Sequence, residues 1–212
     1  EVKKSIENAD AIEKALLQSA LADLYYEYYQ NYRYKIYSIT PVADTVEDFT
    51  LWDAKRISSE IVQLYDASLS NAKVLQQLPL ENYLPIVENP KGNGAFVMTT
   101  LYDLLAYKTI RFFSDSDIRM SEVKDAYEMN APFLMGAAEN FVKQKIQSTD
   151  SLSFDLKTIQ LYQEWLAFKL TQKNPAALVE VDLMRLAFVN EKYTGDNKRA
   201  LYEEALIELR KQ

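Results

Sequence analysis

The chain has 212 residues and a formal net charge of −7, from 24 Lys and Arg residues against 31 Asp and Glu residues. It contains no histidine and no cysteine. That composition excludes Ser-His-Asp and Cys-His nucleophile systems, imidazole and thiolate metal ligands, and disulfide bonds. The excess of acid disfavours nucleic acid or an anionic membrane surface as a partner, because phosphate binding depends on clustered Lys and Arg.

The composition predicts an all-α fold. The chain has only 4 glycines and few stretches that alternate apolar and polar residues, which favours helices joined by short turns. We expect about seven helices in a single helical domain over 1–212, with two subdomains over 1–90 and 95–212 as an alternative. No apolar run approaches the roughly 20 residues of a membrane span. The first residue is Glu1 rather than Met, so we expect the chain to be a piece of a longer protein.

A long first helix is predicted from about Ser5 to Ser38, where Thr40 and Pro41 end it because proline removes an amide donor. At a rise of 1.5 Å per residue, this helix would be about 50 Å long. Helical spacing gives a main apolar stripe of Ile12, Leu16, Leu24, Tyr28, Tyr32 and Ile36, with Leu17, Leu21, Tyr25 and Tyr29 beside it. We expect the main stripe to face the core.

The middle of the chain contains two predicted capping boxes. The first pairs Thr50 with Asp53 at the start of a helix that runs to about Asn71. The second pairs Thr100 with Asp103 at the start of another helix. Between them, the segment 73–93 is rich in proline and predicts two short helical turns followed by a loop, which makes it the best candidate linker.

The last third has the most regular pattern. After a shorter helix near 133–147, helices are expected at roughly 154–171, 175–193 and 197–210. Asn174 as a cap with Pro175 in the first turn, and Gly195 just past a helix end, are typical of such boundaries. Helices of similar length on tight turns stack as αα-hairpins, so this third is predicted to be solenoid-like.

Seven tyrosines lie between Tyr25 and Tyr37. Tyrosine rings on two faces of a helix could stack on a glycan or anchor a protein partner, because tyrosine provides a large contact area at low entropic cost. The alternative is that the helix packs on two sides and buries the ring bodies. As candidate contact residues we choose Tyr26, Tyr29 and Tyr34, which fall partly off the main stripe.

Other motifs do not predict chemistry. Asp115 and Asp117 resemble the start of a calcium loop, but Met120 stands where glycine is needed and Ala126 where a bidentate glutamate is needed. The Gly92-Asn93-Gly94 turn lacks the Lys-Ser/Thr of a phosphate loop. Carboxylate pairs such as Glu203 with Glu204, or Asp10 with Glu13, are expected on solvated helix surfaces. The sequence therefore predicts no catalytic, cofactor or metal site.

Several stretches together resemble the helical N-terminal region of large bacterial alpha-2-macroglobulin-like proteins of the cell envelope. They are Leu51-Trp-Asp-Ala-Lys55, Leu64-Tyr-Asp-Ala-Ser-Leu69, Thr100-Leu-Tyr-Asp-Leu-Leu-Ala106 with Phe112-Phe113, and Lys173-Asn-Pro-Ala-Ala-Leu178. The similarity spans roughly 45–210 and rests on the order and spacing of these helical patterns. Tyr107 follows Leu-Leu-Ala where histidine is expected in many relatives.

The resemblance implies a helical module ahead of a string of β-sandwich domains, in a periplasmic or extracellular protein that traps or inhibits proteases. The resemblance places the family's trapping chemistry, which is a bait segment and in some members a Cys-Gly-Glu-Gln thioester, outside this helical region. No thioester residue can be carried over, because the chain has no cysteine. We therefore expect a non-enzymatic interaction or spacer module that docks on neighbouring β-sandwich domains or on a partner protein. The alternative is a glycan- or peptide-binding helical repeat domain that uses the tyrosine cluster and the C-terminal hairpins.

Overall fold

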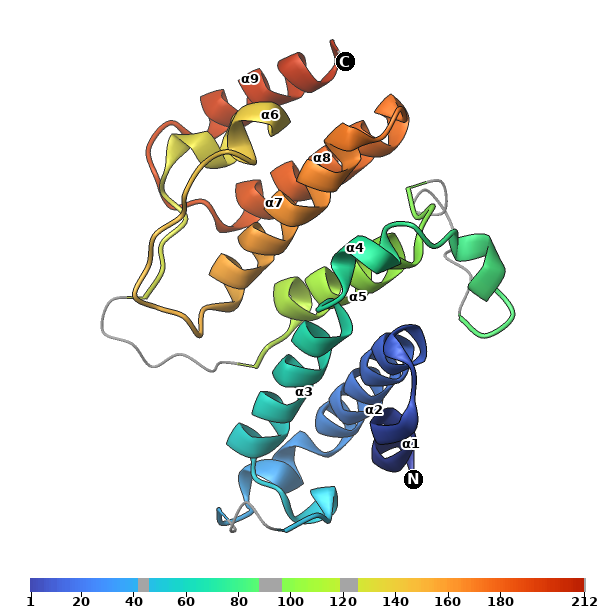
Figure 1. Cartoon of the computed structure of the whole chain (residues 1–212). Coiled ribbons are helices and arrows are strands. Elements are labelled where there is room, and N and C mark those ends of the chain that lie inside the picture. The colour runs from blue at the N-terminus through green and yellow to red at the C-terminus, as the bar shows by residue number, and fades with distance from the viewer. Residues whose placement is uncertain (42–45, 88–96, 119–125, 212) are drawn as a thin grey trace. The chain divides into compact units, whose positions relative to one another are not determined.

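A computed structural model describes residues 1–41, 46–87, 97–118 and 126–211 (Figure 1). The described residues form helices and turns with no strand among them, which confirms the all-α prediction. The chain divides into two compact units, Glu1–Leu78 and Pro79–Gln212. The division therefore lies before Pro79, and not between 90 and 95.

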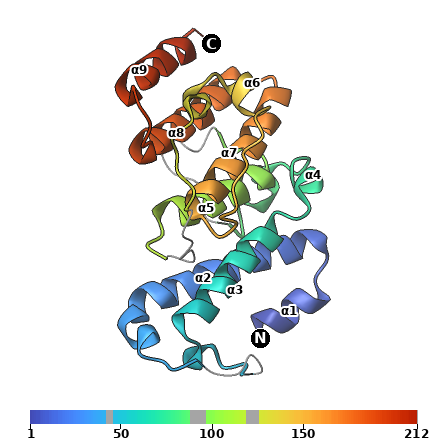
Figure 2. The same ribbon diagram turned by 90° about the vertical axis from the view of Figure 1, so that its left-hand side faces the viewer.

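Unit 1 is built around a pair of helices. Its elements are α1 (Val2–Asn8), α2 (Ala11–Tyr37), the 3-10 turn η1 (Phe49–Leu51), α3 (Ala54–Ser68) and α4 (Ala72–Leu75). Helices α2 and α3 pack side by side, and both views show them together (Figures 1 and 2).

Two predicted helix starts in unit 1 are wrong, and aspartate caps explain both. The Asp10 side chain accepts hydrogen bonds from the backbone N–H groups of Ile12 and Glu13, so a new helix begins there and the predicted helix from Ser5 is divided. The side chain of Asp53 likewise caps α3, while Thr50 lies in the preceding 3-10 turn. In both places an aspartate side chain caps the first turn of the helix.

The predicted core face of the first long helix is also partly wrong. Leu24 and Tyr32 of the main stripe are 54% and 52% exposed, whereas Tyr25 and Tyr29 beside it are buried. The buried face of α2 also carries small residues, namely Ala15, Ser19 and Ala22. Small side chains allow a neighbouring helix to approach closely, so α2 buries the face on which they lie rather than the face with the most large apolar residues.

Unit 2 is a stack of helices. Its elements are η2 (Leu80–Tyr83), α5 (Leu101–Asp115), η4 (Pro132–Met135), α6 (Ala138–Phe141), α7 (Phe154–Thr171), α8 (Pro175–Lys192) and α9 (Lys198–Leu209). Helix α5 packs on α7, α7 on α8, and α8 on α9 (Figures 1 and 2). The last two of these contacts are those that the predicted hairpin stack of the C-terminal third requires. The helix predicted near 133–147 is instead a 3-10 turn followed by one helical turn.

Local caps fix the ends of the helices in unit 2. Thr100 and Asp103 form the predicted capping box at the start of α5. Asn174 caps α8, since its Oδ1 accepts a hydrogen bond from the backbone N–H of Ala177 at 3.1 Å. In the turn before α9, Asn197 has φ 57° and ψ 22°, a left-handed conformation that asparagine tolerates better than most residues. Across the described part of the chain, none of the helices is long and apolar enough to cross a membrane.

Candidate functional site

A buried charge cluster joins α5 to α7 in unit 2. The Oδ1 atom of Asp103 accepts a hydrogen bond from Nε1 of Trp165 at 2.8 Å and lies 2.8 Å from Nζ of Lys169. Its Oδ2 atom accepts hydrogen bonds from the backbone N–H groups of Thr99 and Thr100, both at 3.0 Å. The Asp103 carboxylate therefore caps α5 and binds two side chains of α7 at once.

Lys169 is equally well partnered. Its ammonium group also donates to the carbonyl oxygen of Val97 at 2.9 Å and to Oε1 of Gln172 at 3.1 Å. Burial lowers the pKa of Lys169, and the adjacent Asp103 carboxylate opposes that shift. Neither side chain has exposed surface, so a substrate cannot reach this ion pair. We interpret the cluster as part of the fold rather than as acid and base for a reaction.

A second buried ion pair lies on α8. The guanidinium of Arg185 donates from Nε to Oδ1 of Asp182 at 2.7 Å, and its Nη2 lies 2.6 Å from the same oxygen. Its terminal nitrogens also donate to the carbonyl oxygens of Leu134 and Gly136, and it stacks on the ring of Phe141. Burial raises the pKa of Asp182, while the guanidinium acts in the opposite direction. Arg185 thus binds the segment that contains η4 and α6 to α8.

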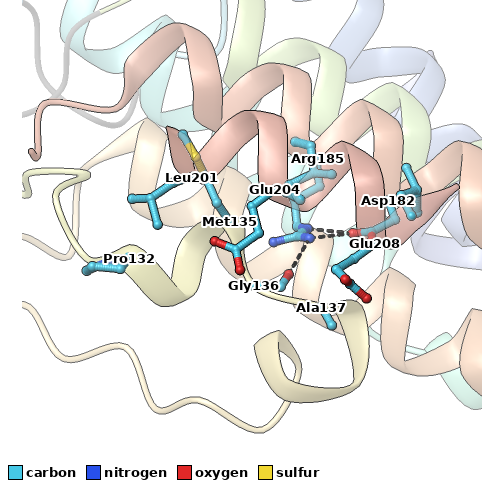
Figure 3. Close-up of a pocket in the computed structure, with 12 residues that line it drawn as sticks. Pro132, Met135, Gly136, Ala137, Asp182, Arg185, Leu201, Glu204 and Glu208 are labelled. Atoms are coloured by element: carbon cyan, nitrogen blue, oxygen red, sulfur yellow. Dashed lines mark hydrogen bonds and ion pairs between the residues drawn. The ribbon is translucent and has the colours of Figure 1, made fainter. Parts of the chain in front are cut away.

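A cleft of about 220 Å³ lies over this ion pair, between α8, α9 and η4 (Figure 3). We call it the α8–α9 cleft. Seven of its twelve lining residues are apolar, namely Pro132, Met135, Ala137, Leu186, Leu201, Ala205 and Leu209. Glu204 and Glu208 of α9 also line it, and both are exposed. The cleft therefore combines an apolar wall with acidic side chains.

Some charged side chains of the α8–α9 cleft form ion pairs, whereas the Glu204 carboxylate does not among the ion pairs of the described residues. Asp182 neutralises Arg185, and Lys211 forms an ion pair with Glu208. No cation lies within 4.0 Å of the Glu204 carboxylate among the ion pairs of the described residues. The volume is below the roughly 300 Å³ at which cofactor and drug-sized pockets begin. The cleft has room for a side chain rather than for a cofactor.

The three tyrosines predicted as contact residues have different environments. Tyr29 is only 2% exposed, and its hydroxyl lies 2.9 Å from that of Tyr37, so it is not accessible to a partner and its choice as a contact residue is wrong. Tyr26 is half-buried. Tyr34 is 90% exposed, and of the three it is the one whose ring is fully available at the surface.

Sequence analysis missed the α8–α9 cleft. One signal was present, because Asp182 and Arg185 are three positions apart within the apolar pattern of a predicted helix. Charged residues at that place indicate an internal ion pair rather than a solvated surface. The carbonyl partners of Arg185 are 49 and 51 residues away in the sequence, and local patterns cannot identify such partners.

The remaining motifs add no site. Gly92-Asn93-Gly94 and most of the calcium-like stretch after Asp117 lie outside the described residues. Within the described ranges, no three or more Asp and Glu residues are grouped so that they could hold a metal ion. Comparison of the chain with protein-family models, curated proteins and solved structures gave no match. Function therefore has to be inferred from the chain's own residues.

Proposed function

We propose that the chain is a non-enzymatic interaction module of an alpha-2-macroglobulin-like protease-trapping protein of the bacterial cell envelope. The positions of the residues that carry the resemblance support this proposal. Asp103, in the 100–106 stretch, accepts the buried hydrogen bond from Trp165. Asn174, in the 173–178 stretch, caps α8. Trp52, in the 51–55 stretch, is buried in unit 1. These three residues of the resembling stretches thus have roles that a helical scaffold needs.

The burial and the pairing of the charged side chains in unit 2 support a non-enzymatic role. A general acid or base must be able to reach its substrate. Asp103, Lys169 and Arg185 have no exposed side-chain surface, and each binds groups of its own unit. They provide stability and a defined arrangement of helices, which an interaction module requires.

Exposed apolar side chains on α2 support a docking role. Leu24, Tyr32 and Tyr34 are each more than half exposed. The Tyr28 and Tyr32 rings lie with their centroids 4.9 Å apart, and that of Tyr28 is 5.0 Å from Phe49. Aromatic side chains of this kind contribute strongly to protein contacts. The proposed partners are neighbouring β-sandwich domains of the parent chain or another envelope protein.

The proposal is tested first on the gene. Sequencing the DNA on both sides should reveal an open reading frame in which β-sandwich domains follow and a lipoprotein-type signal precedes. Calorimetric titration of the chain with the first of these domains should then show binding that Leu24→Ser and Tyr32→Ser both weaken. A frame that stops close to Gln212 would contradict the proposal.

A second candidate function is binding of a glycan or peptide by the aromatic end of α2. The exposure of Tyr32, Tyr34 and Tyr37 favours it, because exposed rings can stack on sugars. Titration with a panel of bacterial oligosaccharides, followed by tyrosine fluorescence, tests this candidate. Binding that is lost in Tyr34→Ser would support it, and no change in fluorescence with any sugar would exclude it for that panel.

A further inference from the structure

We infer that the α8–α9 cleft binds a lysine side chain of a partner protein. This inference rests on the proposed function, since it gives the partner chemistry for one surface of the interaction module. Three properties of the cleft carry it: its volume, its apolar wall and its uncompensated acidic charge.

The volume and the wall favour a narrow aliphatic chain. The cleft holds about 220 Å³, and seven of its twelve lining residues are apolar. A lysine side chain has four methylene groups that can lie along such a wall while the ammonium group stays at the opening. A bulkier or fully polar occupant would leave the contacts with Leu186, Leu201 and Leu209 unused.

The charge favours a cation over an anion or a neutral group. Glu204 borders the cleft and has no cation within ion-pair distance among the described ion pairs. Arg185 cannot attract an anion effectively, because Asp182 binds it through two nitrogen atoms and its side chain is buried. Figure 3 shows the Arg185 guanidinium directed at Asp182 and Gly136, and the carboxylates of Glu204 and Glu208 on the α9 side of the cleft.

Lysine fits this arrangement better than arginine. A guanidinium group binds best where an aromatic face or a pair of acceptors matches its plane. None of the twelve lining residues is aromatic. The ring of Phe141 is already covered by Arg185, whose guanidinium carbon lies 4.3 Å from the ring centroid. An ammonium group needs only a nearby carboxylate and water. Glu204 supplies that carboxylate.

The test is a titration of the isotope-labelled full chain with acetyl-Ala-Lys-Ala-amide, followed by amide chemical shifts in nuclear magnetic resonance. We expect saturable shifts at Leu201, Ala205 and Gly136, and binding that weakens as salt is added. The matched peptide with norleucine in place of lysine has the same stem without the charge. Equal binding of both peptides, or no saturable shift at these positions, would overturn the inference.

Two variants and a control localise the binding. Glu204→Gln should weaken binding of the lysine peptide about two- to fivefold, as is typical of an exposed ion pair. Ala205→Phe should fill the cleft and abolish binding. Glu203→Gln makes the same charge change one residue earlier, at a side chain that pairs with Arg199 and does not line the cleft, and should bind as the unchanged chain does. Equal effects of Glu203→Gln and Glu204→Gln would also overturn the inference.

The experiments distinguish a failure of the inference about the cleft from a failure of the proposed function. If the chain binds the following β-sandwich domain but not the lysine peptide, only the inference about the cleft fails. If it binds the peptide while the reading frame encodes no such domain, the cleft stands and the alpha-2-macroglobulin-like assignment fails. Since Glu204 is exposed, Glu204→Gln should fold even if Ala205→Phe does not.

Discussion

The indole nitrogen of Trp165 donates a hydrogen bond to Oδ1 of Asp103 at 2.8 Å, although 62 positions separate the two residues in the sequence. The same oxygen lies 2.8 Å from the ammonium of Lys169, and the other oxygen caps α5. One carboxylate therefore determines where α5 begins and how α7 lies against it. Buried polar groups of this kind stabilise a fold only when all of them are partnered.

The first prediction is that Asp103→Asn strongly destabilises unit 2. The amide cannot neutralise the buried ammonium of Lys169, and breaking a buried ion pair by changing one partner typically costs about 3–5 kcal/mol. Urea unfolding of the full chain, followed by circular dichroism, measures the free energy of unfolding. We expect the transition of unit 2 to move to a much lower urea concentration.

Two further variants make this prediction specific. Adding Lys169→Met to Asp103→Asn removes the unpaired charge and should recover part of the lost stability, because the two effects are coupled. Asp196→Asn changes an exposed aspartate in the same unit and should alter the free energy of unfolding by less than about 0.5 kcal/mol. An Asp103→Asn chain as stable as the Asp196→Asn chain would show that the network contributes little.

The second prediction concerns Gly195, in the turn between α8 and α9. A Cβ atom at this position would lie 2.6 Å from the carbonyl oxygen of Asn130 and 2.6 Å from the hydroxyl of Tyr193. Those two groups form a hydrogen bond of 3.0 Å, so neither can move away without breaking it. Gly195→Ala should therefore cost about 1–3 kcal/mol, as overpacking usually does. Thermal unfolding measures this loss.

Gly136→Ala is the matched control for Gly195→Ala. Its added Cβ would come no closer than 3.2 Å to its neighbours, at the carbonyl oxygen of Phe133. A displacement of a few tenths of an ångström relieves that contact, so the midpoint temperature of thermal unfolding should fall less for Gly136→Ala than for Gly195→Ala. Equal midpoints for the two variants would contradict the steric explanation.

Local sequence signals predicted the last three helices of unit 2 well. The bounds of α7 match the predicted 154–171, α8 ends one residue earlier than predicted, and α9 is one residue shorter than predicted at each end. The reason is that capping acts within a few residues, as in Asn174 and Thr100, so a short window contains all the information.

Contacts between distant segments were not predictable in the same way. The α8–α9 cleft depends on Arg185 binding carbonyl groups of 134–136, and no local pattern specifies those acceptors. In unit 1, the spacing of large apolar residues favoured the face of α2 with Leu24 and Tyr32. Packing against α3 instead selected the face that carries small residues, a choice that depends on the partner helix and not on α2 alone.

The third prediction separates two tyrosines of α2 that the sequence alone treats alike. Tyr29→Ser removes a buried ring and its hydroxyl contact with Tyr37, and should cost about 3–5 kcal/mol, as truncation of a core aromatic does. Tyr34→Ser changes a ring that is almost fully exposed and should change stability by less than about 0.5 kcal/mol. Thermal unfolding of the two variants checks both values. A large loss in Tyr34→Ser would mean that its ring packs within the fold.

The fourth prediction is a loss of stability at alkaline pH. Burial is the largest cause that raises the pKa values of Tyr65, Tyr102 and Tyr162 above the ordinary value of 10.0. Above about pH 10 the unfolded chain therefore releases phenolic protons that the folded chain retains, so the unfolded state binds fewer protons and stability falls as pH rises. Each such tyrosine contributes about 1.4 kcal/mol per pH unit to this fall.

Tyr102→Phe isolates the contribution of one tyrosine. Its ring packs edge-on against Phe168 with the centroids 5.4 Å apart, and phenylalanine can keep that contact at neutral pH. The fall in the free energy of unfolding of unit 2 above pH 10 should become shallower by about 1.4 kcal/mol per pH unit in this variant. Tyr34→Phe, which makes the same substitution at a ring that is 90% exposed, is the matched control. A slope in Tyr102→Phe identical to that of the unchanged chain would mean that the Tyr102 phenol ionises as readily in the folded state as in the unfolded one.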